Sequence, residues 1–159
     1  RNAINWWGDV DATVEYTIRT VERVCKQYGG DRNRVFLAGF SRGSIACSYI
    51  GLRNEKIAGL WRGFICHSHL DGVRKWNYKD SDASSALSRW ARLNNRPAFI
   101  PHEVSAQAAR DFLETNKVQG RFTFVNLPFP NHTAGWLLRD LPETRQIRDW
   151  WNKQSRLAD

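Results

Sequence analysis

A serine between two glycines follows an apolar run in the first third of the chain. The letters GFSRG at residues 39–43 come directly after VFLA at residues 35–38. The apolar run predicts a buried strand and the residues from Arg42 to Ile50 predict a helix, so Ser41 is expected on the tight turn between them. Both glycines are expected to be required there, because the turn leaves no room for side chains. A hydroxyl presented in this way is typical of a hydrolase nucleophile.

A serine hydroxyl is a poor nucleophile until a base removes its proton, so Ser41 needs a histidine within reach. The chain has four histidines, which are His67, His69, His102 and His132. His132 lies in the sequence PFPNHT at residues 128–133, directly after a predicted strand. Its position also gives the chain order serine, acid, histidine that hydrolases with such a turn use. We therefore predict that His132 is the general base.

The acid that would orient His132 has two main candidates. Glu103 follows a predicted strand at residues 97–100, and Asp71 follows another at residues 63–66. Ligands bind at the carboxyl ends of parallel strands, so either carboxylate could approach the imidazole. The acid usually follows the later strand in this architecture, which favours Glu103, although a glutamate at a helix start could instead complement the helix dipole. Asp71 and, more remotely, Asp140 stay open as alternatives.

The sequence HSHLD at residues 67–71 also permits a metal hypothesis. His67, His69 and Asp71 alternate after a strand, which resembles half of a dinuclear zinc site. A histidine directly after the aspartate would extend that pattern, but Gly72 stands there. These residues are therefore interpreted first as the lining of a substrate pocket, with His69 in contact with substrate, and only second as ligands of a zinc-dependent hydrolase.

The chain has eight tryptophans, which is many for its length. Trp90 and Trp150 lie on apolar helix faces and are expected in the core. Trp136 follows the predicted base closely, and Trp6 and Trp7 lie in a predicted loop. These three are candidates for aromatic walls around an acyl group or a sugar ring, with core packing as the alternative for each.

Strands and helices are predicted to alternate along the whole chain. Strands are expected at residues 34–40, 63–66, 97–100 and 121–127, and helices at 9–28, 42–50, 82–94, 105–115 and 142–154. Ser105 is the expected N-cap of the fourth helix. This alternation predicts an α/β fold with a parallel sheet of about four strands, flanked by helices on both faces.

Composition limits the classes of protein to consider. The 159 residues suit a single domain, and no apolar run is long enough to cross a membrane. The net charge of +8 is spread over scattered lysines and arginines. This distribution is interpreted as a solvated basic surface, and no nucleic-acid partner is predicted because no recognition motif accompanies the charge. The three cysteines lack any C-x-x-C spacing and do not indicate a metal knuckle.

The sequence DRNRVFLAGFSRG at residues 31–43 resembles the α/β-hydrolase superfamily, in the branch of polyhydroxybutyrate depolymerases and feruloyl or acetyl-xylan esterases. The preceding helix and the His132 loop also fit this resemblance. It implies that Ser41 is the nucleophile, His132 the base, and the backbone N–H of Arg42 an oxyanion donor. It further implies a serine esterase that needs no cofactor and acts on a small-molecule or polysaccharide-linked ester.

The resemblance covers only the carboxyl half of that fold, so 1–159 is interpreted as a single partial domain. The N-terminal strands of the family, and the loop that supplies its second oxyanion donor, are expected to be missing. The strand before Ser41 would then have one unpaired edge, which favours pairing with another chain. A non-catalytic module that forms a homo-oligomer through this edge is therefore the alternative to the esterase.

Overall fold

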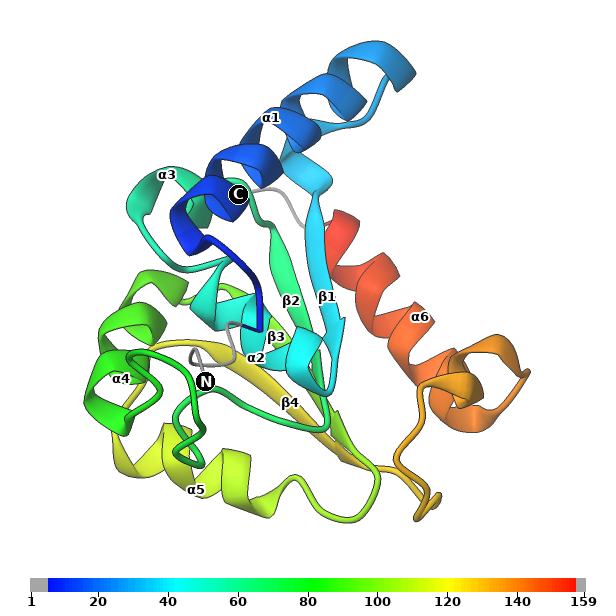
Figure 1. Cartoon of the computed structure of the whole chain (residues 1–159). Helices are drawn as coiled ribbons and strands as arrows, with labels where there is room; N and C mark the ends of the chain where they lie inside the picture. The colour runs from blue at the N-terminus through cyan, green and yellow to red at the C-terminus, as the bar shows by residue number, and fades with distance from the viewer. Residues whose placement is uncertain (1–5, 157–159) are drawn as a thin grey trace.

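Four parallel strands form the centre of the protein (Figure 1). The structure, a computed structural model, describes residues 6–156. The strands lie side by side in chain order and are β1 (Phe36–Phe40), β2 (Gly63–His67), β3 (Pro97–His102) and β4 (Arg121–Asn126). The predicted α/β class and the parallel sheet are confirmed.

Helices separate the strands and cover both faces of the sheet (Figure 1). They are α1 (Val10–Tyr28), α2 (Arg42–Tyr49), α3 (Glu55–Ala58), α4 (Ala83–Trp90), α5 (Gln107–Thr115) and α6 (Pro142–Arg156). Short 3₁₀ turns span η1 (Arg32–Arg34), η2 (Ala91–Leu93) and η3 (Gly135–Leu138). Within residues 6–156, none of the helices combines the length and the apolar character that a membrane crossing requires.

The side chains of each strand alternate between two cores, because successive residues of a strand point to opposite faces. Phe64 and Cys66 are buried in the larger core, which α1 to α5 cover. Ile65 between them packs on the smaller core, to which Trp150 of α6 belongs. Figure 1 shows α6, in orange and red, on the side of the sheet opposite to α2 and α4. Helices therefore pack against both faces of the sheet, as is usual for a parallel sheet.

The observed boundaries differ from the predicted ones by a few residues in most elements, and three of the differences have a clear cause. β1 begins at Phe36 because Asp31 caps a 3₁₀ turn over the preceding residues. β3 continues two residues beyond Ile100, in register with β4. α5 begins at Gln107 rather than at Ser105, because the Asn126 side chain accepts the N–H of Ala106 in the preceding turn. The short elements α3 and η3 were not predicted.

The strand register places the carboxyl ends of the strands together. Phe40, the last residue of β1, pairs with His67, the last residue of β2. His102 and Asn126 likewise end β3 and β4 opposite one another. The residues that follow these four strand ends therefore meet at one edge of the sheet, where ligands bind in folds of this kind.

Candidate active site

Ser41 stands on a strained turn between β1 and α2. Its φ of 56° and ψ of −119° are unusual for a residue with a side chain, and such backbone strain concentrates at functional sites. Ser41 occupies the N-cap position of α2, yet its hydroxyl makes no capping hydrogen bond. The hydroxyl is directed instead to the Nε2 atom of His132, 3.0 Å away. The turn thus presents an oxygen atom to a base.

The two glycines beside Ser41 have different roles. A Cβ atom on Gly39 would collide with the carbonyl group of Gly43, because the first turn of α2 passes directly over β1. A Cβ atom on Gly43 would meet nothing within 4 Å. The steric requirement expected for both glycines is therefore present only at Gly39, and at Gly43 that expectation was wrong.

His132 connects Ser41 to a buried carboxylate. Its Nδ1 atom makes a short hydrogen bond to Oε1 of Glu103, and its ring packs against Phe40, with centroids 4.6 Å apart. Glu103 directly follows β3 and only 7% of its side chain is exposed. The carboxylate favours the tautomer in which Nδ1 carries the proton, which leaves Nε2 free to accept the proton of Ser41. The three side chains thus form a continuous chain of hydrogen bonds from the hydroxyl of Ser41 to the carboxylate of Glu103.

Ser68 is a fourth member of the hydrogen-bond network, and the sequence analysis missed it. Its hydroxyl lies 2.7 and 2.8 Å from the two oxygens of Glu103 and 3.1 Å from Nδ1 of His132. Its φ is 85°, a left-handed conformation that few residues other than glycine adopt. A serine two residues after the predicted strand at residues 63–66 was the only signal in the sequence, and this signal is common.

The electrostatic surroundings keep Glu103 ionised. Burial acts to raise the pKa of this carboxyl, but hydrogen bonds from His132 and Ser68 outweigh burial and lower the pKa to about 2. A carboxylate that is charged throughout the neutral pH range stabilises the imidazolium that forms when His132 takes a proton.

His67 is buried next to this carboxylate. Its side chain is 3% exposed, and its Nε2 atom lies 3.6 Å from Oε2 of Glu103. Neither ring nitrogen makes a hydrogen bond within the described residues. Burial lowers the pKa of His67 to about 4, against the opposing effect of the Glu103 charge. The ring is therefore neutral at pH 7.

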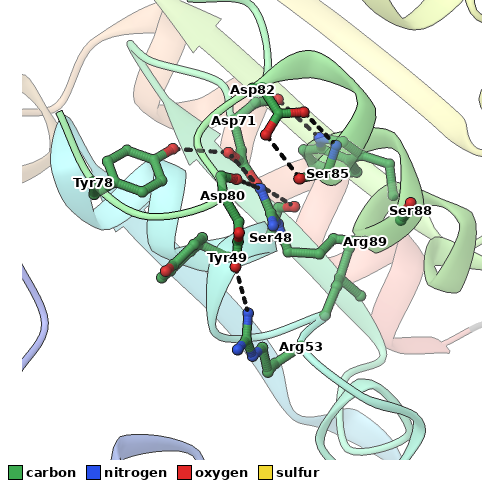
Figure 2. A network of polar contacts seen from close by, with 12 residues as sticks. Ser48, Tyr49, Arg53, Asp71, Tyr78, Asp80, Asp82, Ser85, Ser88 and Arg89 are labelled. Atoms are coloured by element: carbon green, nitrogen blue, oxygen red, sulfur yellow. Dashed lines mark hydrogen bonds and ion pairs between the residues drawn. The ribbon is translucent and has the colours of Figure 1, made fainter. Parts of the chain in front are cut away.

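Asp71 lies in a separate buried cluster (Figure 2). Its carboxylate accepts hydrogen bonds from Nε and Nη2 of Arg89 at 2.8 and 3.2 Å, from Ser48 at 3.0 Å and from Tyr78 at 2.9 Å. These donors occupy both oxygens, and the side chain is fully buried. The geometry thus favours Glu103 over Asp71 as the acid. Asp140, the remote alternative, contacts Arg145 instead, at 3.6 Å.

The residues of the zinc hypothesis diverge from one another. His67 faces Glu103, Asp71 binds Arg89, and the ring of His69 stacks on that of His132 at a centroid distance of 5.3 Å. Among residues 6–156, no three His, Cys, Asp or Glu side chains are grouped so that they could hold a metal ion. This geometry does not favour the zinc hypothesis.

The predicted aromatic walls lie at different depths. Trp136 is 4% exposed and packs in the smaller core, with its ring 5.7 Å from that of His67. Trp136 therefore packs against His67 from the smaller core and does not line an open pocket. Trp6 lies nearer to the surface, with Arg42 over its ring at 5.3 Å and Trp76 5.4 Å away.

Comparison with solved structures identifies the fold. A Bacillus cereus carboxylesterase resembles this chain with a TM-score of 0.56 and 15% sequence identity, over 92% of this chain. The fold is that of the α/β-hydrolases. This chain covers 62% of the carboxylesterase chain, which is less than two thirds of its length. No protein-family model matches the sequence, and a search of curated proteins found no match.

The start of α2 lies directly after Ser41. The first backbone N–H groups of a helix have no intrahelical partner and favour negative charge near them. Arg42 is the first residue of α2, and its backbone N–H has no partner within the helix. The partial positive charge of the helix start adds to its effect. The guanidinium of Arg42 lies over the ring of Trp6, so the part of Arg42 next to Ser41 is its main chain.

On the esterase expectation from the sequence, Ser68→Ala should lower the turnover number by about 10- to 100-fold, the range found when a residue that supports a primary ligand is removed. The loss arises because Glu103 and His132 lose a shared partner that fixes their relative orientation. Steady-state kinetics on a nitrophenyl ester provides the measurement. Ser84→Ala, a replacement at an exposed serine on α4, is the control, and equal rates for both variants would contradict a positioning role for Ser68.

The pH dependence of stability is expected to reveal His67. Its pKa of about 4 lies below the ordinary value of 6.5, so between these values the unfolded chain takes up a proton that the native protein does not. Stability is therefore unaffected above pH 6.5 and falls as the pH drops toward 4, by up to about 3 kcal/mol. The charged or titratable groups facing His67 are Glu103, His69, His102 and His132. Urea unfolding of wild type and His67→Asn at several pH values measures this effect. If the free energy of unfolding falls equally with pH in both proteins, the prediction is contradicted.

Proposed function

We propose that this protein hydrolyses carboxylic esters through a covalent acyl-enzyme formed on Ser41. The observation that carries the proposal is the continuous chain of hydrogen bonds from Ser41 through His132 to Glu103, with the serine on a strained turn. Similarity to a carboxylesterase supports the same reaction class at the level of the fold.

The first half of the reaction forms the acyl-enzyme. His132 Nε2 takes the proton of the Ser41 hydroxyl as its oxygen attacks the carbonyl carbon of the ester. The carbonyl oxygen becomes negative and accepts a hydrogen bond from the N–H of Arg42. The ester C–O bond then breaks, and His132 gives its proton to the departing alcohol oxygen. The acyl group remains bound to Ser41.

Water completes the reaction along the reverse path. His132 removes a proton from a water molecule, whose oxygen attacks the acyl carbon. The bond to Ser41 breaks, and the serine oxygen recovers the proton from His132. The carboxylic acid then leaves, and the site returns to its initial state. Glu103 stays ionised throughout and stabilises the positive charge that forms twice on His132.

The substrate class follows from the sequence resemblance alone. The branch that includes polyhydroxybutyrate depolymerases and feruloyl or acetyl-xylan esterases suggests an ester of a small molecule or of a polysaccharide. Panels of nitrophenyl esters of increasing chain length, together with acetylated and feruloylated xylan, would distinguish these substrates.

Covalent labelling tests the proposed nucleophile. A fluorophosphonate probe is expected to modify the protein with a stoichiometry of one, and peptide mass spectrometry should locate the label on Ser41. Labelling depends on the activated serine and not on the nature of the substrate. A correctly folded protein that takes no label, or takes it on another residue, would rule the proposal out.

A second candidate function is self-association through the edge of the sheet. Among the described residues β1 pairs only with β2, and Ala38 in the middle of β1 is exposed. An unpaired strand edge offers main-chain donors and acceptors to another chain. Sedimentation over a range of concentrations tests this candidate, and a stable monomer that turns over esters would exclude it.

A further inference from the structure

A cavity lies beside the carboxyl ends of β2 and β3, next to the hydrogen-bond network of Ser41, His132 and Glu103. Its volume is about 170 Å³, and its lining includes His69, Leu70, Arg74, Trp76, His102 and Ala109. A cavity of about 150 Å³ is large enough to receive one benzene ring. The space therefore suits a single ring or a short chain, and not a polymer.

Two lining residues join the cavity to the reacting atoms. Ser68 lines it and hydrogen-bonds to Glu103 and His132. His69 also lines it, and its ring stacks on the ring of His132 with an interplanar angle of 27°. The ring of His69 thus lies between a group bound in the cavity and the ring of His132. Such a group can belong to an ester whose carbonyl carbon lies at Ser41.

The cavity is suited to negative charge. Arg74 holds its guanidinium 4.6 Å from the centre of the Trp76 ring, an arrangement that orients the planar group. No Asp or Glu is among the described residues that line the cavity, and none of those described lies within ion-pair distance of Arg74. Glu103 lies behind Ser68, with its oxygens engaged by His132 and Ser68.

His102 is a second lining residue with a side chain that can donate a hydrogen bond. Nδ1 of His102 accepts the backbone N–H groups of Val104 and Ser105, at 3.1 and 3.3 Å. The proton of the neutral ring is therefore on Nε2. Burial, followed by the charges of neighbouring groups that include His132 and Arg74, lowers the pKa of His69, which keeps this ring neutral. The described part of the cavity wall thus combines hydrogen-bond donors with flat rings, and no carboxylate is among its lining residues.

The wall that carries Arg74 and Trp76 is fixed before any ligand arrives. Trp76 and Ser81 are hydrogen-bonded to each other through both main-chain groups of Trp76. At the ends of this loop, Asp71 and the carbonyl of Asp80 both bind Arg89 (Figure 2). A loop tied at both ends loses little conformational freedom on binding, which favours affinity and selectivity.

We propose that this cavity is a subsite for a carboxylate carried by the ester substrate, in which Arg74 pairs with the carboxylate and Trp76 packs against the adjoining ring or chain. The inference rests on the proposed esterase function and adds a substrate class to it, namely small esters with an anionic group. The planar fork of arginine can donate two parallel hydrogen bonds to a carboxylate.

Matched substrate pairs test this subsite in wild type, Arg74→Gln and Lys75→Gln. Lys75 is an exposed neighbour on the same loop that does not line the cavity, so its variant controls for net charge. The pair 4-acetoxybenzoate and 4-acetoxybenzamide places the charge on the alcohol part. The pair 4-nitrophenyl hemiglutarate and 4-nitrophenyl valerate places it on the acyl part. Each measurement is the ratio of kcat/KM for the charged ester to that for the neutral one.

Arg74→Gln is expected to lower this ratio by about tenfold in one of the two pairs, the size of a charge-assisted hydrogen bond. Lys75→Gln should leave this ratio at the wild-type value, because Lys75 does not line the cavity. The pair that responds tells which half of the ester enters the cavity. Unchanged ratios in both pairs, or an equal effect of Lys75→Gln, would overturn the proposal.

A binding experiment separates this inference from the esterase function. Titration calorimetry of 4-hydroxybenzoate and of glutarate into the Ser41→Ala protein requires no turnover. At least one of these anions is expected to bind, about tenfold more weakly to Ser41→Ala/Arg74→Gln. Equal affinities, or no binding of either anion, would overturn the subsite even if ester hydrolysis is found. If the wild-type protein hydrolyses no ester but the anions bind as expected, only the esterase function is refuted.

Discussion

Glu103→Gln is expected to lower the turnover number of ester hydrolysis by about 10³- to 10⁴-fold, with a small change in KM. An amide is nearly the same size as the carboxylate but can donate a hydrogen bond to Nδ1 of His132, which would place the imidazole proton on Nε2. In that tautomer His132 cannot accept the proton of Ser41. The loss of negative charge also removes the stabilisation of the imidazolium. The measurement is steady-state kinetics near pH 7 on a neutral nitrophenyl ester.

Glu114→Gln is the matched control for this experiment. Glu114 lies on α5 in an exposed contact with Arg110, and the same change there is expected to leave kcat unaltered. Binding of an uncharged ester depends little on Glu103, so KM should remain within about threefold of wild type. A kcat that falls less than tenfold in Glu103→Gln, or that falls instead in Asp71→Asn with the fold intact, would show that the triad acid is another residue.

The strained turn at Ser41 and the approach of His132 to it could be predicted from the sequence because their signals are local. An apolar run, a serine between glycines and a helix pattern occupy neighbouring residues around Ser41. His132 had few competitors, and its place after the last strand agreed with the chain order of the fold. The parallel sheet followed from the same alternation of strands and helices, and the structure confirms it.

The choice between Glu103 and Asp71 depended on distances that no local pattern contains. Each follows a strand, and both are buried. What separates them is a residue far away in sequence. Arg89, on α4, extends into the core and forms an ion pair with Asp71. The sequence pattern of this helix did not indicate such a contact. Long-range pairing of a buried charge is a property of the fold.

Ser68 and Gly43 show the same limit of prediction from sequence. Ser68 has a contact that was not predicted, and Gly43 lacks a steric requirement that was predicted. Ser68 gained a role because the left-handed turn after β2 directs its hydroxyl to Glu103. Gly43 lost its expected role because α2 departs from the sheet in a direction that leaves open space beside its Cα atom. A pattern of residue types indicates that a turn is present, but the direction of the chain after the turn depends on packing against the rest of the sheet.

Asp71→Asn is expected to reduce the free energy of unfolding by about 3–5 kcal/mol, since it leaves the Arg89 charge buried without a partner. The Arg89 side chain is 5% exposed, so water cannot replace the lost carboxylate. Ser48 and Tyr78 would also lose an ionised acceptor. A domain has about 5–15 kcal/mol of stability in total, so the change is a large fraction of it. Urea unfolding at pH 7, followed by circular dichroism, measures the loss.

Asp80→Asn provides the matched control within the same cluster (Figure 2). The side chain of Asp80 is 38% exposed and lies 3.9 Å from Arg53, and its φ of 57° suits asparagine, so a loss of less than about 1 kcal/mol is expected there. If Asp71→Asn does not fold, the double variant Asp71→Asn/Arg89→Met decides. Removal of the buried charge should then restore folding in part, because the cost lies in the unpaired guanidinium and not in the missing carboxylate. A double variant that is no more stable than Asp71→Asn would contradict this account.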